Sequence, residues 1–396
     1  MFESIQLAPP DPILGLTEAF KADPNPDKIN LGVGVYQDDD GKTPVLEAVK
    51  RAEAKVFEAE STKGYLPILG SSEFAGHVQR LLFGAGNAPD AAGRAVTAHT
   101  PGGTGALRVA AEFLRIHAGN PAVWLTTPTW PNHEPVFAAA GVETKTFPWF
   151  DSGTNRFDAG AALDGLRQIP GGEAVLLHGC CHNPTGCDPT AEQWESIADA
   201  IAGNGLLPVI DIAYQGLADG LEDDGRGLRH LAARCPELVI CSSFSKNFGL
   251  YRERTGALTM VAKDADTATR LASQLKKTIR TNYSNPPSHG GAAVTAVFAD
   301  PELRALWERE LGVMRDRLNR VRRQFADGMK SAGCERDFGF LTRQRGMFSM
   351  LGLTREQVDA LREQHSIYMV GSSRVNVAGM TSANLPGLCA AIAEVL

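Results

Sequence analysis

Apolar and polar positions alternate along the chain in a pattern that predicts short buried strands separated by amphipathic helices. Five continuous apolar runs have the length of buried strands, namely Ala122 to Leu125, Ala174 to Leu177, Leu206 to Ile210, Leu238 to Cys241 and Ala257 to Val261. The segments between them carry apolar residues at helical spacing. This alternation is typical of βαβ units, so we expect a three-layer α/β domain with a mostly parallel sheet.

The pattern changes in the last third of the chain, which predicts a second and smaller domain. One long charged helix is expected from Pro301 to about Lys330, and two helices and short strands follow Gly333. These strands are expected at Met347 to Leu351, Ile367 to Val370 and Val375 to Val377. We therefore predict an N-terminal arm at 1–12, a large domain at 44–312, and a small α+β domain made of 13–43 and 313–396.

Two helices are expected before the first strand. Asp11-Pro12 is a helix-start signal, and that helix is expected to run to about Lys21. Pro44 is expected to begin the second helix, whose apolar residues fall at helical spacing at Val45, Val49, Ala52 and Val56.

Composition narrows the class of protein. Of 396 residues, 43% are apolar and 21% charged, which is ordinary for a soluble globular protein. The net charge of −7 comes without a long basic run, so neither nucleic acid nor an anionic membrane is expected as a partner. No apolar run is long enough for a membrane span and no signal pattern appears, so a cytoplasmic enzyme is expected. The seven cysteines form no C-x-x-C pair, and we expect no metal site.

Chemically capable side chains follow several of the predicted strands. Lys246 comes after the run that ends at Cys241, Asp211 ends another strand, Asn183 begins a turn, and Trp130 lies in a loop. The carboxyl ends of parallel strands meet at one edge of a sheet, so these side chains should lie close together. A desolvated lysine near Arg254 and other cations would have a lowered pKa and could act as a nucleophile. Taken alone, Lys246 would more commonly be a surface lysine.

A glycine-rich turn at 101–108 could bind phosphate. Gly102, Gly103 and Thr104 stand immediately before a helical run, where unpaired N–H groups attract an anion. We expect no strand directly before this turn, and Arg108 occupies the place where a dinucleotide fingerprint needs its last glycine. Taken alone, a simple tight turn is the commoner explanation.

Together these groups match the needs of one cofactor. Pyridoxal 5′-phosphate needs a lysine amine, an aspartate on its ring nitrogen and a cradle for its phosphate. Neither a catalytic triad nor a carboxylate pair competes with this assembly in the sequence.

The motifs also resemble a known family. Along the whole chain the sequence is similar to the class I aminotransferases of the fold-type I pyridoxal-phosphate group, in their aspartate and aromatic amino acid branch. The stretches that carry the resemblance are 30–36, 101–108, 128–133, 178–186, 211–216, 243–249, 282–287 and 373–380. Each stretch alone is a modest signal, whereas all of them in this order are specific.

The resemblance implies how the cofactor ring is held. Lys246 would bind the cofactor covalently and then carry a proton to and from the substrate. Asp211 would pair with the ring nitrogen, supported from behind by His133. Asn183 and Tyr214 would hydrogen-bond to the ring oxygen.

Further positions are implied for the phosphate and for the face of the ring. Trp130 would stack on the ring. The phosphate would be held by Gly103, Thr104, Ser243 and Arg254, with charge-assisted bonds from the arginine.

The resemblance also implies two substrate-binding arginines and a homodimer. Arg374 would hold the substrate α-carboxylate as a bidentate fork, with Gly34, Asn183 and Trp130 beside the substrate. Arg280 would meet the distal carboxylate in the neighbouring subunit's site. From that side, Tyr65 and Ser284 would reach the other subunit's phosphate.

Substrate choice is divided between two candidates. Val35, Thr43, Thr104 and Asn285 resemble aspartate-specific members, whereas the segment 367–374 resembles aromatic-preferring ones. Transamination between aspartate and 2-oxoglutarate is therefore the first hypothesis, and aromatic amino acid transamination is the alternative. A cofactor-binding DNA regulator is disfavoured because no basic helix is present. A lyase or decarboxylase is disfavoured because Arg280 suits dicarboxylates.

Overall fold

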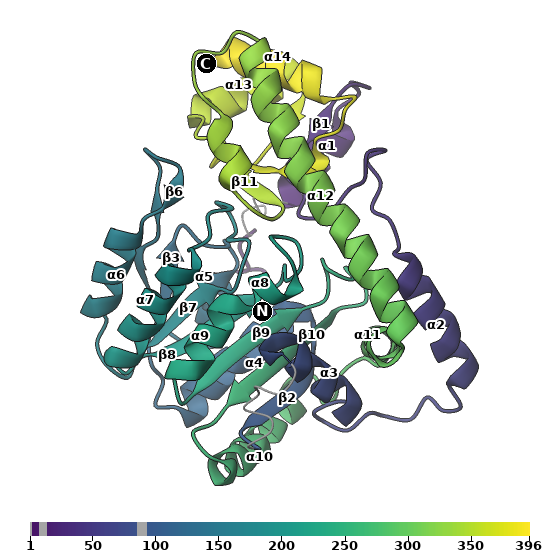
Figure 1. Ribbon diagram of the computed structural model, residues 1–396, viewed down its shortest axis with the longest axis vertical. Helices are drawn as coiled ribbons and strands as arrows, with labels where there is room; N and C mark the ends of the chain where they lie inside the picture. The colour runs from purple at the N-terminus through teal and green to yellow at the C-terminus, as the bar shows by residue number, and fades with distance from the viewer. Residues whose placement is uncertain (1, 8–13, 85–92) are drawn as a thin grey trace. The chain divides into compact units, whose positions relative to one another are not determined.

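A computed structural model describes residues 2–7, 14–84 and 93–396 of the protein. Two compact units can be distinguished in it (Figure 1). The large unit comprises 44–316 and 344–346, and the small unit comprises the described residues up to Thr43 together with 317–343 and 347–396. The expected helix start at Asp11-Pro12, and most of the arm at 1–12, lie outside the described residues.

The large unit is built on a seven-stranded sheet with the order β2-β10-β9-β8-β7-β3-β4. The strands are β2 (Ala95–Pro101), β3 (Val123–Thr127), β4 (Thr144–Pro148), β7 (Ala174–His178), β8 (Leu207–Ile212), β9 (Leu238–Ser243) and β10 (Thr255–Val261). Neighbours from β4 through β9 pair in parallel, whereas β10 runs antiparallel to both β9 and β2. The predicted α/β fold with a mostly parallel sheet is therefore confirmed, as are the five strands predicted from apolar runs.

Helices flank this sheet and bury its apolar side chains (Figure 1). The helices of the large unit that precede α12 (Pro301–Ser331) are α2 (Glu47–Ala59), α3 (Ser72–Phe83), α4 (Gly102–His117), α5 (His133–Ala139), α6 (Ala159–Gln168), α7 (Ala191–Gly203), α8 (Leu221–Asp224), α9 (Arg226–Arg234), α10 (Ala265–Asn282) and α11 (His289–Ala299). Of these, α2 packs on α11 and α8 on α9. The unit also holds a small hairpin of β5 (Phe150–Asp151) and β6 (Arg156–Phe157). Among the described residues, none of the helices has the length and apolar character that crossing a membrane requires.

Two details of the large unit correct the sequence-based expectations. Contrary to the prediction, a strand (β2) ends directly before the glycine turn. The apolar criterion misses it because, apart from Ala98, its buried side chains are polar. Among these, Thr97 accepts a hydrogen bond from Gln79 (2.9 Å) and shares one with Thr259 (2.8 Å). The helix predicted from Pro44 begins only at Glu47, where the carboxylate of Glu310 accepts the backbone N–H groups of Glu47 and Ala48 (2.7 and 3.0 Å).

The small unit combines helices with two short two-stranded sheets. β1 (Ile29–Asn30) pairs in parallel with β12 (Ile367–Tyr368), and β11 (Phe348–Met350) pairs antiparallel with β13 (Arg374–Asn376). Its remaining elements are α1 (Leu14–Ala22), the 3₁₀ turns η1 (Gly339–Arg343) and η2 (Val377–Gly379), α13 (Arg355–His365) and α14 (Leu385–Val395). Three strands and two helices after Gly333 were predicted, and both are confirmed.

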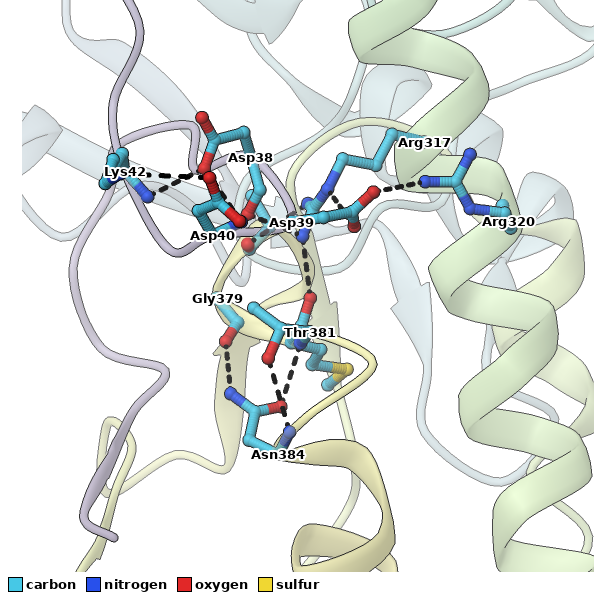
Figure 2. A network of polar contacts seen from close by, with 11 residues as sticks. Asp38, Asp39, Asp40, Lys42, Arg317, Arg320, Gly379, Thr381 and Asn384 are labelled. Carbon is cyan, nitrogen blue, oxygen red and sulfur yellow. Dashed lines mark hydrogen bonds and ion pairs between the residues drawn. The ribbon is translucent and has the colours of Figure 1, made fainter. Parts of the chain in front are cut away.

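One helix, α12 (Pro301–Ser331), contributes residues to both units, and its Arg317 organises the small one. The buried Arg317 guanidinium donates to Asp39 Oδ1 at 2.8 Å (Figure 2). It also donates to the backbone oxygens of Asp38, Ala378 and Met380 at 3.0, 3.2 and 3.0 Å. Arg320 donates to the other oxygen of Asp39 (2.8 Å). One arginine side chain thereby fixes the loop before Lys42 against the segment after β13.

Candidate active site

Lys246 lies in the turn directly after β9, and its environment lowers the pKa of its amine. Lys246 Nζ is 5.1 Å from the ring centroid of Tyr214, which follows β8. Burial is the largest cause of the lowered pKa of Lys246; Arg254 lowers it further, and Asp211 opposes both. A lysine of lowered pKa is uncharged over a wider pH range and is therefore a better nucleophile and proton acceptor.

The carboxylate of Asp211, on β8, is buried and held by a histidine. His133 Nε2 lies 3.1 Å from Asp211 Oδ2, and His133 Nδ1 lies 2.8 Å from Thr129 Oγ1. Burial alone would raise the pKa of Asp211, but the hydrogen bond and charge of His133, aided by His178 and Lys246, lower it below the usual value. The carboxylate therefore stays ionised, as it must to pair with a protonated ring nitrogen.

A second buried histidine, His178, lies next to His133 and was assigned no role from the sequence. The ring of His178 lies 5.2 Å from that of His133, and within the described residues neither of its nitrogens has a hydrogen-bond partner. Burial, then the charge of His133, lower the pKa of His178 to about 3, against an opposing effect of Asp211. His178 is therefore neutral at physiological pH, and His133 is the histidine that pairs with Asp211.

Trp130 and Asn183 stand at the same edge of the sheet. Trp130, in the loop after β3, meets the ring of His133 edge-on at 5.2 Å. Asn183 is buried in the turn after β7, where it precedes a cis proline. β7 pairs with β8 so that His178 lies opposite Asp211, which places the Asn183 turn beside the aspartate's strand end. The structure thus brings Lys246, Asp211 and Trp130 to one strand edge, as their positions in the sequence predict.

Backbone and side-chain donors form an anion cradle at the start of α4. Gly256 of β10 lies between Thr100 of β2 and Ser243 of β9, so the register places the α4 N-terminus beside Ser243. A Cβ atom on Gly103 would lie 3.1 Å from Ser243 Cβ, and one on Gly102 would lie 2.5 Å from a guanidinium nitrogen of Arg254. Thr104 stands in the first turn of the helix. The cradle combines helix N–H groups, hydroxyls and a guanidinium, which suits a phosphate dianion.

The donor set fits pyridoxal 5′-phosphate. Lys246 would supply an amine for its aldehyde, Asp211 an ionised carboxylate for its ring nitrogen, and the α4 cradle a site for its phosphate. The glycines matter because any side chain at Gly102 would take the space in which Arg254 lies.

Arg374 belongs to the small unit and is held there in a fixed position. It begins β13, is buried, and donates to the backbone oxygen of Gly32 at 3.0 Å. Its guanidinium lies 4.4 Å from the ring centroid of Phe348, on the paired strand β11. A Cβ atom on Gly34 would lie 3.6 Å from the same ring. An arginine stacked in this way is already oriented for a planar carboxylate.

Three predicted residues stand apart from the Lys246 cluster. Tyr65 is 95% exposed, and Arg280, in the last turn of α10, is also exposed and donates to Ser284. Within the described part of the chain, none of the three hydrogen-bonds to Lys246, Asp211 or Ser243.

Among residues 2–7, 14–84 and 93–396, two groups of side chains have atoms close enough to hold a metal ion, although the sequence predicts no metal. One is His133, His178 and Asp211, which belong to the site above. The other is Cys180, Cys181 and Asp224, but the Asp224 carboxylate already accepts the backbone N–H groups of Gly216, Ala218, Asp219 and Gly220. All seven cysteines are free thiols.

The site combines a lysine amine at a strand end, an ionised aspartate on the neighbouring strand and a phosphate cradle. On a mostly parallel α/β sheet, these features define a pyridoxal-phosphate-dependent transferase of fold type I. Residues 26–392 match the family aminotransferase class I and II, and the chain belongs to this family. It is a pyridoxal-phosphate-dependent transaminase.

Individual relatives cover the whole chain. It is 52% identical over 396 residues to the aspartate aminotransferase of Escherichia coli strain K12, with 100% of both chains covered. It is 45% identical over 394 residues to the aromatic-amino-acid aminotransferase of Pseudomonas aeruginosa, covering 100% of this chain and 98% of the relative. The structure of the aromatic-amino-acid aminotransferase from Burkholderia pseudomallei, covalently bound to pyridoxal phosphate, is similar with a TM-score of 0.97 at 48% identity, covering 100% and 99% of the two chains.

Proposed function

We propose that the protein moves the amino group of L-aspartate to 2-oxoglutarate, giving oxaloacetate and L-glutamate in a ping-pong cycle. The observation that carries the proposal is the amine of Lys246, which is half-buried over the ring of Tyr214 and whose pKa is lowered by its withdrawal from water and by the charge of Arg254. The aspartate aminotransferase of Escherichia coli, identical at 52% of positions, supports aspartate as the substrate.

In this proposal each residue of the strand edge has a defined task. Bound pyridoxal 5′-phosphate supplies an electron sink for the charge that develops at the substrate Cα. Lys246 Nζ takes the proton from Cα, which it does best when its own pKa is low. Asp211 keeps a proton on the ring nitrogen, and His133 keeps Asp211 ionised.

The remaining contacts orient the two molecules. Trp130 would cover one face of the ring, and Asn183 and Tyr214 would hydrogen-bond to the ring oxygen. The cradle of Gly103, Thr104, Ser243 and Arg254 would hold the phosphate.

Substrate recognition is assigned to two arginines. Arg374 binds the α-carboxylate, and its stacking on Phe348 and bond to Gly32 support that role because they leave a flat fork already oriented. Gly34 lies beside the same phenyl ring. Arg280 binds the distal carboxylate.

We propose further that the enzyme is a homodimer with composite sites. Arg280, Tyr65 and Ser284 act in the partner's site, and the exposure of Tyr65 and Arg280 supports this because a residue that serves another subunit must lie at the surface. In the same proposal 13–43 with 313–396 form a small domain, and 44–312 form the cofactor-binding domain. The free cysteines are consistent with a cytoplasmic location.

Aromatic amino acid transamination is the second candidate. The relative from Pseudomonas aeruginosa and the structure from Burkholderia pseudomallei both carry an aromatic specificity in their names, at 45% and 48% identity. An enzyme acting on both substrate classes would use the same Lys246 and Arg374 and differ only around Arg280.

Single-turnover spectroscopy tests the proposal. The purified protein with pyridoxal phosphate should be yellow, and aspartate alone should bleach the colour faster than phenylalanine or tyrosine. The variant Arg280→Ala should slow the reaction with aspartate far more than that with phenylalanine. Equal losses would contradict the role of Arg280, and a protein that stays colourless and inert with the cofactor would overturn the whole proposal.

A further inference from the structure

A stripe of side chains on α12 contacts the turn that carries Lys246. Trp307, Leu311 and Arg315 are spaced four residues apart, so they share one face of the helix, within the large unit. Trp307 is fully buried, and its indole Nε1 donates a hydrogen bond of 2.8 Å to the backbone oxygen of Asn247. That carbonyl belongs to the residue directly after Lys246.

Aromatic packing holds the same turn on both sides of the lysine. The ring of Phe248 stacks on the indole of Trp307, with centroids 4.5 Å apart and planes at 22°. Phe244 meets Phe248 edge-on at 5.6 Å. Phe244 and Phe248 stand two residues before and two residues after Lys246, and both are buried. The lysine is therefore the middle of a short segment whose two ends are anchored in the core.

The stripe also contacts the turn that carries Tyr214. Arg315 Nη1 donates to the backbone oxygen of Gly216 at 3.2 Å, and a Cβ atom on Gly216 would lie 2.3 Å from Leu311 Cδ2. The two turns are joined directly as well, because Asn247 Nδ2 donates to the backbone oxygen of Gln215 at 3.2 Å. One helix face thus supports both members of the pair Lys246 and Tyr214.

We propose that Trp307 is a positioning residue for Lys246, acting through the backbone oxygen of Asn247. Without the indole N–H, this buried carbonyl loses its donor and the turn shifts to find another. A shift of the turn changes how far Lys246 Nζ is withdrawn from water and how it lies over Tyr214. The inference rests on the proposed function, in which Lys246 is the reacting amine.

The variant Trp307→Phe tests the inference, because it removes the N–H and keeps a ring to stack on Phe248. Its matched control is Trp124→Phe, which also removes an indole N–H. The Trp124 indole donates to Glu173 near the amino-terminal ends of β3 and β7, whereas the site lies at the carboxyl ends of the strands. In the cofactor-free proteins, competitive labelling of lysines with trace acetic anhydride, read by mass spectrometry over a pH series, gives the pKa and reactivity of Lys246.

In Trp307→Phe the pKa of Lys246 should rise toward its ordinary value by roughly half a unit or more, because the amine is better hydrated. With the cofactor bound, kcat should fall roughly 10-fold while KM changes little, since geometry and not binding is lost. The pH midpoint of the cofactor's absorbance should also move. Trp124→Phe should leave the Lys246 pKa, kcat, KM and the absorbance midpoint at their wild-type values.

The outcomes separate this inference from the proposed function. If Trp307→Phe and Trp124→Phe give the same Lys246 pKa and the same kcat, Trp307 is not a positioning residue. If Trp307→Phe fails to fold, benzothienylalanine at position 307 replaces the N–H by sulfur in a ring of the same shape. The Lys246 pKa and kcat of that protein then decide whether Trp307 is a positioning residue. If the wild-type protein with cofactor shows no colour that depends on Lys246, the proposed function fails, whatever the variants do.

Discussion

His133 Nε2 lies 3.1 Å from Asp211 Oδ2, and this contact decides the ionisation of the aspartate. Burial by itself would favour the neutral acid, yet the pKa of Asp211 lies below its usual value because His133 compensates with a hydrogen bond and a charge. An aspartate of depressed pKa is ionised at every pH above that value, so its function is lost only as the pH falls through it.

Removing the histidine should therefore move the acid limb of the pH–rate profile. In His133→Ala the pKa of Asp211 rises, and the acid limb of kcat/KM should move to higher pH, on the order of one pH unit. Steady-state kinetics over a pH series measures this. The control His230→Asn, on α9 and near Glu195, should keep the wild-type profile. An acid limb that stays in place in His133→Ala would show that His133 does not set the charge of Asp211.

Lys246→Ala should abolish most of the proton transfer. General acid–base catalysis contributes about 10²- to 10⁴-fold, so kcat should fall by at least that factor. The α4 cradle is intact in this variant, so the cofactor should still bind, as equilibrium dialysis with pyridoxal phosphate can show. Lys263→Ala, at an exposed lysine after β10, serves as the control and should behave as wild type. A kcat within a few fold of wild type in Lys246→Ala would remove this residue from the chemistry.

The cradle can be tested with two glycines of the same backbone conformation. Gly102 has φ +72° and a Cβ there would lie 2.5 Å from an Arg254 nitrogen, whereas Gly119 has φ +78° and open space around it. Alanine at either position costs about 1–2 kcal/mol of backbone strain. Only Gly102→Ala should also weaken cofactor binding, because it displaces the guanidinium. Equal dissociation constants for pyridoxal phosphate in the two variants would contradict this role of Arg254.

Arg374 should be required for every substrate that has an α-carboxylate. Lysine cannot form a planar fork or stack on Phe348 in the same way, so Arg374→Lys should lower kcat/KM on the order of 100-fold. The loss should be similar for aspartate and phenylalanine, in contrast to the selective loss in Arg280→Ala. A loss restricted to one of the two amino acids would assign Arg374 to the side chain of the substrate.

Stability of the small unit should depend on Arg317 and much less on Arg320. Arg317→Lys gives up the forked bonds to three backbone oxygens and should cost about 1–3 kcal/mol of local opening free energy. Arg320→Lys removes one exposed contact with Asp39 and should cost about 0–1 kcal/mol. Hydrogen exchange of the amides in 36–43 and 376–381 measures both. Equal protection in the two variants would mean that the network in Figure 2 does not hold these segments together.

The sequence predicted the fold where burial and apolar character coincide. β7, β8 and β9 are apolar runs buried on both faces, so each is visible in the sequence as a continuous stretch. β2 escapes this criterion because Thr97 and His99 are buried and polar. The hydroxyl of Thr97 is satisfied by Gln79 and Thr259, which lie 18 and 162 residues away in the chain. Pairing of that kind has no local signal.

The candidate site was predictable only in part, namely where its residues follow strands that apolar runs reveal. Lys246 and Asp211 follow strands that the apolar runs identify, and the order of strands in a parallel sheet brings their ends together. Trp307 could not be found in this way, because it contacts the lysine turn from a helix 60 residues further along the chain. His178 is likewise recognisable only once β7 and β8 are seen to pair.

The small unit is built from separate segments of the chain, and this restricts how it can be exchanged between related proteins. Because the small unit takes residues from both ends of the chain while 344–346 belong to the large unit, a chimera must replace three stretches at once. The second of them joins the large unit inside α12, between Asp316 and Arg317. The stripe of Trp307, Leu311 and Arg315 then comes from the protein that provides the large unit. Arg317 and Arg320 come from the protein that provides the small unit, and they need an acidic residue at position 39 from that same protein. A chimera that meets these two conditions keeps α12 continuous. Each half of the helix then packs against the residues that it contacts in its own parent protein.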